Sequence, residues 1–63
     1  MTYYIYHRKP TGFVKQLGFA FDKAEAIKKA KAYAMHQRLD VEVHGRRNLQ
    51  THSVKIFEVE GGL

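Results

Sequence analysis

Histidine is the residue type that most directly suggests chemistry in this sequence, because the chain has four histidines and no cysteine. They are His7, His36, His44 and His52. A zinc site needs several His, Cys or carboxylate ligands at short spacings, which these histidines do not show. His44 and His52 come close if the final hairpin is tight, but two imidazoles without a neighbouring carboxylate make a poor site. We therefore expect no metal and no cofactor.

The sequence also shows no arrangement of residues that is typical of a catalytic site. The sequence indicates no Ser–His–Asp or Cys–His set, and no pair of carboxylates on one element facing a cleft. A chain of 63 residues leaves little room for the concave pocket that a substrate needs. We expect a protein that is not an enzyme and has no small-molecule substrate.

Basic residues near predicted turns are the remaining chemical signal. Arg46 and Arg47 are adjacent in a predicted hairpin, where two guanidinium groups are suited to holding phosphates. The candidate nucleic-acid contacts are Arg8, Lys9, Lys15, Arg46 and Arg47. Tyr4 and Tyr6 would supply rings that stack on bases.

The charge of the chain is unevenly distributed along it. Eleven Lys and Arg against six Asp and Glu give a net charge of +5. Residues 1–38 contain eight of the bases and two of the acids, whereas residues 39–63 contain three bases and four acids. Such an asymmetry is typical of a face that attracts phosphate or an acidic protein surface. The alternative is a solvated lysine surface that maintains solubility.

The length and composition set the class of protein. Sixty-three residues allow one small domain, and the absence of cysteine excludes a disulfide framework. No apolar run approaches the roughly 20 residues of a membrane span, and no signal-peptide segment follows Met1. We expect a small cytoplasmic protein of a bacterium or phage, with no membrane association.

The pattern of residues predicts two strands, a helix and two further strands. Residues 3–8 and 13–17 are the first two strands, joined by a turn in which Pro10 presets the bend and Gly12 permits positive φ. Residues 39–44, which alternate between apolar and polar, and residues 53–59 are the last two. A turn at residues 45–48 joins them, with Asn48 suited to a left-handed conformation.

The helix is predicted from residue 23 to about residue 37. Asp22 and Glu25 have the spacing of a capping box, and alanine dominates the predicted buried stripe. We predict an α+β domain of two layers, ββαββ, with a four-stranded, largely antiparallel sheet and one helix packed on one face. The domain spans residues 1–63, with an ordered core of about 3–59 and a C-terminal tail at 60–63.

A single helix covers one face of such a sheet and leaves the other face open. Both registers of the last strand are apolar, so the pattern does not decide which of its residues face the helix. The candidate interface on the open face is Tyr4, Tyr6, Val14, Phe57 and Val59. We expect a homodimer or a protein partner at this face. The alternative is that this face binds nucleic acid. Asp40 and Glu42 argue against it, because they are acidic and are expected on the same face.

Several short motifs resemble those of a small bacterial family of similar length, domain-of-unknown-function family 2188. They are Gly12-Phe13, residues 23–27, the alanine pair Ala30 and Ala34, and residues 43–45. The family's usual Trp is replaced by Phe13, and its usual Asp-Gly turn by Arg47-Asn48. The resemblance covers residues 3–57 and implies the fold without assigning a site or an activity.

Residues 18–26 are also similar to the strand-to-helix segment of the DNA-binding arm domains of tyrosine recombinases. That likeness favours the nucleic-acid alternative by analogy.

Overall fold

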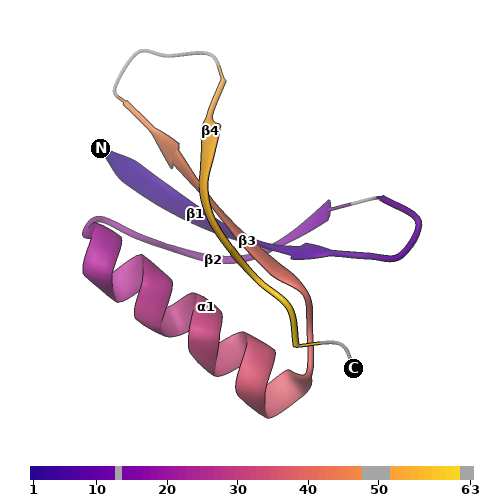
Figure 1. The fold of residues 1–63 in the computed structure, drawn as a ribbon. Helices are drawn as coiled ribbons and strands as arrows, with labels where there is room; N and C mark the ends of the chain where they lie inside the picture. The colour runs from indigo at the N-terminus through magenta and orange to yellow at the C-terminus, as the bar shows by residue number, and fades with distance from the viewer. Residues whose placement is uncertain (13, 48–51, 62–63) are drawn as a thin grey trace.

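The order of the secondary-structure elements is the predicted one (Figure 1). The computed structural model describes residues 1–12, 14–47 and 52–61. Within these ranges, the elements are β1 (Thr2–Arg8), β2 (Val14–Ala20), α1 (Lys23–Gln37), β3 (Val41–Arg46) and β4 (Val54–Val59). The strands form one sheet in the order β2-β1-β3-β4, and each neighbouring pair is antiparallel. The predicted α+β fold is confirmed.

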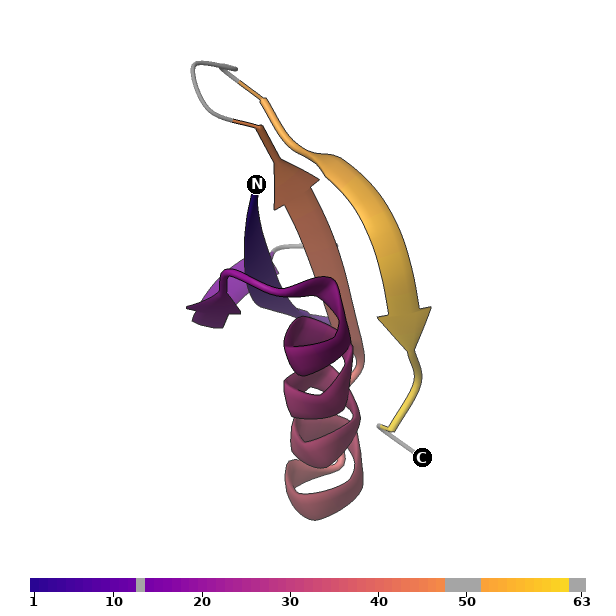
Figure 2. The same ribbon diagram turned by 90° about the vertical axis from the view of Figure 1, so that its left-hand side faces the viewer.

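The core lies between the sheet and α1. Figures 1 and 2 show the helix along one side of the sheet, while β3 and β4 extend beyond its first turn. Ile5, Val41 and Val43 are fully buried on the helix side of the sheet. The helix contributes a stripe of small buried residues, which are Ala26, Ala30 and Ala34. Because alanine side chains are short, the helix axis can approach the sheet closely.

The helix begins as the sequence predicts. Asp22 has an extended backbone, and its side chain accepts a hydrogen bond of 3.1 Å from the Glu25 N–H. The helix ends at Gln37, and its C-cap residue Arg38 adopts the left-handed conformation with φ of 54°. Glycine is the usual residue at such a position, since a Cβ disfavours positive φ.

The β1–β2 connection is also as predicted. Gly12 has φ of 87°, and its N–H donates a 2.8 Å hydrogen bond to the Lys9 carbonyl oxygen. The second predicted turn fits less well, because β3 continues through Gly45 and Arg46. Phe13, Asn48 and residues 62–63 lie outside the described residues.

Two β-bulges shift the register of the sheet. Ile5 pairs with Gly18 and Tyr6 with Gln16, so Leu17 is the extra residue of β2. Val43 pairs with Phe57 and His44 with Lys55, so Ile56 is the extra residue of β4.

The β4 bulge corrects the predicted interface. Phe57 and Val59 pair with Val43 and Val41 and pack against the core on the helix side, so their predicted place on the open face was wrong. The extra residue moves Lys55 onto the same face as Glu58, opposite His44 and Glu42 respectively.

Gly61 lies within the packed structure, although the sequence predicted a tail from residue 60. Its N–H donates a 3.1 Å hydrogen bond to Asp40 Oδ1. A Cβ at this position would overlap the carbonyl oxygen of Ala34 and lie 2.7 Å from that of Leu39. The chain therefore passes tightly against the end of α1 and the start of β3.

Candidate nucleic-acid interface

The open face of the sheet is defined by the pairing of its strands, because directly paired residues project to the same side. Its residues, strand by strand from β2 to β4, are Val14, Gln16 and Phe19; Thr2, Tyr4, Tyr6 and Arg8; Glu42, His44 and Arg46; and Lys55 and Glu58. The β2–β1 side of this face is aromatic and the β3–β4 side is charged. Of the predicted interface, this face therefore has Tyr4, Tyr6 and Val14 but not Phe57 and Val59.

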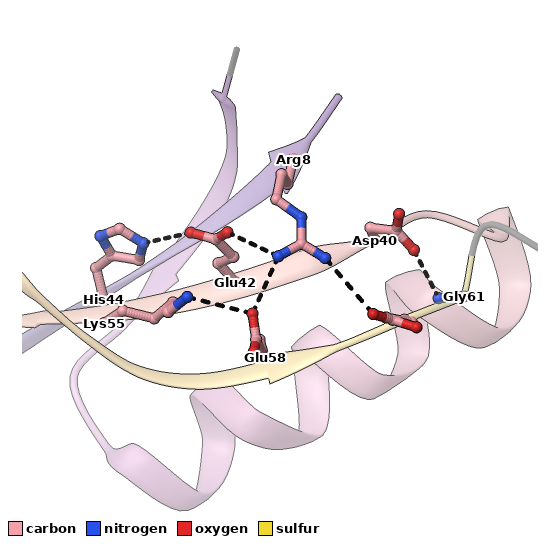
Figure 3. Close-up of polar contacts among 8 residues, drawn as sticks. Arg8, Asp40, Glu42, His44, Lys55, Glu58 and Gly61 are labelled. Atoms are coloured by element: carbon pink, nitrogen blue, oxygen red, sulfur yellow. Dashed lines mark hydrogen bonds and ion pairs between the residues drawn. The ribbon is translucent and has the colours of Figure 1, made fainter. Parts of the chain in front are cut away.

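Arg8 joins the acidic residues of the charged side (Figure 3). Its Nη1 lies 3.4 Å from Glu42 Oε2 and 3.0 Å from Glu58 Oε2, and its Nη2 lies 3.9 Å from Glu60 Oε1. Glu42 is only 8% exposed, and a buried carboxylate needs a charged or hydrogen-bonding partner. Arg8, predicted as a nucleic-acid contact, is thus bound to carboxylates of this chain.

Lys55 also contributes to the charge balance of this side. The pKa of the Glu58 carboxyl lies below its ordinary value because Lys55 Nζ donates a hydrogen bond to it at 3.3 Å and adds a positive charge. The charge of Arg8 lowers the same pKa further. The acids of β3 and β4 are therefore largely neutralised within the chain.

His44 connects the charged side to the aromatic side. Its Nε2 lies 2.9 Å from Glu42 Oε1 and donates to that carboxylate, while its Nδ1 lies 3.4 Å from Ser53 Oγ. The edge of the His44 ring contacts Tyr6, with ring centroids 4.8 Å apart and planes at 68°. Tyr4 follows at 6.5 Å from Tyr6. Tyr6 therefore packs against a side chain that is itself held at both nitrogens, and Tyr4 lies beside Tyr6.

The Ser53–His44–Glu42 contacts were not foreseen from the sequence. They have the order of a nucleophile, a base and an acid, with 3.4 Å from Ser53 Oγ to His44 Nδ1 and 2.9 Å from His44 Nε2 to Glu42 Oε1. The His44 ring that they hold also packs against Tyr6. We interpret these contacts as supports for the Tyr6 ring.

A hollow of about 430 Å³ opens beside the two tyrosines. It is lined by Tyr4, Tyr6, Gln16, Arg46, His52 and Ser53. Three of these residues were predicted from the sequence to bind nucleic acid, namely the two tyrosines and Arg46. Gln16 was missed because its place opposite Tyr6 depends on the Leu17 bulge. His52 was considered from the sequence only as a metal ligand, and Ser53 was missed.

The other predicted residues lie around this hollow or away from it. Arg47 and Lys9 are exposed, the first directly after β3 and the second directly after β1. Val14 is exposed and pairs with Arg8, which places it on the open face as predicted. Lys15 pairs with His7, on the helix side of the sheet, so it does not share a face with the tyrosines.

Two general features of the described residues bear on the class of ligand. Residues 1–12, 14–47 and 52–61 contain no cluster of three or more His, Asp or Glu that could hold a metal ion. Among the same residues, no helix has the length and apolar character that crossing a bilayer requires.

Comparisons of this chain with protein-family models, curated proteins and solved structures gave no match. The family resemblance drawn from the motifs stays a prediction.

Proposed function

We propose that the protein is a small, non-enzymatic binding module that holds a single-stranded nucleic acid on the open face of its sheet. The observation that carries this proposal is the hollow in which Tyr4, Tyr6 and Arg46 come together. Rings that stack on bases and cations that contact phosphates are the two components of sequence-tolerant binding to single strands.

The two tyrosines suit a stacking role. Both are half-buried, so their rings are anchored while part of each surface stays accessible. The contact between His44 and Tyr6 restricts the motion of that ring before a ligand arrives, which lowers the entropy lost on binding. Gln16 and Ser53 beside the rings offer hydrogen bonds to base edges or sugar hydroxyls.

The distribution of charge favours a path along β1. Arg46 pairs with Thr2 at the start of β1, Arg47 follows Arg46, and Lys9 follows the end of β1. The strand with its tyrosines thus has exposed cations near both ends. The acids lie toward β4, where Arg8 and Lys55 balance them.

Self-association through the open face has less support. Two of its five predicted residues, Phe57 and Val59, contribute to the core instead. The β3–β4 side of this face is charged, because Glu42 and Glu58 lie there beside Arg8 of β1. Burying these charges under a second sheet face would remove water from them, and desolvation of charged groups is costly.

The proposal is tested by the binding of labelled single-stranded DNA and RNA of mixed sequence, measured by fluorescence anisotropy over a series of salt concentrations. The slope of log K against log salt is negative, and removing two phosphate contacts from a single-strand complex makes it shallower by about 1.4. We expect this change for the double variant Arg46→Ala, Arg47→Ala.

The matched control is Lys28→Ala, Lys31→Ala, which removes the same charge from exposed positions of α1. It should weaken binding only through the net charge. Equal effects of the two double variants, or the absence of binding at low salt, would exclude the proposed site.

A further inference from the structure

The outer edge of β4 is a second surface that the proposed function does not use. β4 is the last strand in the sheet order, and Figure 2 shows it in gold at the outer margin of the molecule. Val54 and Ile56 are 63% and 37% exposed. A shallow groove follows this edge, lined by Lys55, Ile56, Phe57 and Glu58. An exposed edge of this kind is a template for pairing with another strand.

We propose that a second copy of this chain pairs with β4 along this edge, antiparallel and about a two-fold axis. The evidence is the charge pattern of Val54–Val59, which is complementary to itself when the strand is reversed. With the axis between residues 56 and 57, Lys55 lies opposite Glu58 of the partner, and Glu58 opposite the partner's Lys55. In the same register, Val54 lies opposite the partner's Val59.

The bulge at Ile56 makes this register consistent with the faces of the sheet. In a regular strand, residues three apart project to opposite faces, so Lys55 and Glu58 could not both meet their counterparts on one side. Here both lie on the open face, where their side chains are 3.3 Å apart. Val54 and Val59 both lie on the helix face, since they pair with Gly45 and Val41.

The opposite edge of the sheet does not offer the same match. β2 reads VKQLGFA and contains Lys15 but no acidic residue. Antiparallel pairing of two β2 strands therefore leaves both copies of Lys15 without a carboxylate from the other strand. Of the two edges, β4 is the one that fits a second copy.

The dimer would extend the sheet rather than cover its open face. A two-fold axis perpendicular to the sheet turns both open faces to the same side, so the two hollows would share one surface. A thin core gains stability from a longer sheet, because small domains bury little apolar area alone. This inference does not rest on the proposed function, since the strand edge and the hollow consist of different residues.

The experiment exploits the reciprocity of the charge pairs. Light scattering after size exclusion measures the mass of the folded protein over a range of concentrations, with circular dichroism as a check of folding. We expect the wild type to approach twice 7.3 kDa. Lys55→Glu and Glu58→Lys should each give a monomer, because like charges then face each other twice across the axis.

Mixing the two single variants is the decisive step. In the mixed dimer, Glu at position 55 faces Lys at position 58 of the other chain, and Lys55 faces Glu58, so both pairs are again complementary. We expect the mixture to recover the dimer mass. Within each chain, residues 55 and 58 keep like charges, so recovery cannot arise from the intramolecular ion pair. The matched control is Lys28→Glu on α1, which should remain dimeric.

Glu58→Lys also brings a cation toward Arg8, so a second variant is included in case it does not fold. Val54→Lys places a charge on the helix-face side of the same edge and should also give a monomer. A wild type that stays monomeric at millimolar concentration, or a mass that rises beyond the dimer, would overturn the inference. Folded edge variants that remain dimeric would also overturn it, and so would a mixture of folded variants that stays monomeric.

Discussion

Arg8 and Glu42 meet on the open face of the sheet, with Nη1 of the guanidinium 3.4 Å from Oε2 of a carboxylate that is almost fully buried. They come from β1 and β3, 34 residues apart in the chain. The same guanidinium also contacts Glu58. One cation therefore holds together three strands at the end of the sheet where the helix terminates.

The first prediction concerns the stability that Arg8 provides. In Arg8→Met, the aliphatic part of the side chain is kept while the Glu42 carboxylate loses its guanidinium. Removing one partner of a fully buried ion pair costs about 3–5 kcal/mol. Because Arg8 is partly exposed to water, we expect a smaller loss of about 1–2 kcal/mol in the free energy of unfolding, measured by urea denaturation. The exposed Lys28→Met should change it by less than about 0.5 kcal/mol, and equal losses for the two variants would contradict this role.

The second prediction is a dependence of stability on acid pH through Glu58. Its pKa is lowered from 4.5 in the folded chain, chiefly by Lys55 and then by Arg8. A group with a depressed folded pKa stabilises the fold above its unfolded pKa, and the contribution disappears as pH falls through the folded value. As the pH is lowered below about 4.5, the free energy of unfolding should therefore decrease less steeply in Glu58→Gln than in the wild type. Urea denaturation at several pH values measures this difference.

A direct measurement of the same effect is the NMR titration of the Glu58 carboxyl. Lys55→Met removes the first cause of the shift, so the pKa of Glu58 should rise toward its ordinary value. High salt should also raise the pKa of Glu58 toward its ordinary value, because ions screen the attraction between two charges that are exposed to solvent. An unchanged Glu58 pKa in Lys55→Met would show that this ion pair does not form in solution.

The third prediction concerns the close approach of the chain end to the helix. In Gly61→Ala, the new methyl group would meet the carbonyl oxygens of Ala34 and Leu39, which belong to backbone and cannot rotate away. We expect a loss of about 1–3 kcal/mol in the free energy of unfolding, the range for overpacked sites. Gly12→Ala is the comparison, since a Cβ there meets nothing within 4 Å and the loss of about 1–2 kcal/mol comes from positive φ alone. A neutral Gly61→Ala would mean that residues 60–61 behave as the tail predicted from sequence.

The secondary structure was predictable because caps, turns and alternating patterns each depend on only a few neighbouring residues. Asp22 and Gly12 show this directly, since the cap and the turn form with the partners that their spacing indicates. The alternating pattern likewise placed Tyr4 and Tyr6 on the face away from Ile5. Such signals determine which elements form and, where one register is clearly apolar, which side faces the core.

The composition of the open face was not predictable in the same way. β4 is apolar in both registers, and the extra residue Ile56 reverses the alternation in the middle of the strand. Without a known bulge, Phe57 and Lys55 cannot be assigned to faces, because a shift of one residue exchanges the two sides. The pairing of Arg8 with Glu58 spans 50 residues and depends on the strand order, which the sequence pattern did not supply.

The final prediction separates the stacking role of Tyr6 from its contribution to the fold. Tyr6→Phe keeps the aromatic ring and should bind single-stranded oligonucleotides within about twofold of the wild type, whereas Tyr6→Leu removes the ring. Stacking on an aromatic side chain is worth about 1–3 kcal/mol per base, which corresponds to a loss of roughly 5- to 150-fold in affinity. Tyr33→Leu is the matched control, because Tyr33 lies on α1 and its hydroxyl donates to the Leu17 carbonyl on the other side of the sheet. It should reduce stability and leave the affinity of the folded protein unchanged. If folded Tyr6→Leu and Tyr33→Leu bind equally well, the tyrosines of the hollow do not stack on the ligand, and phosphate contacts alone would have to account for binding.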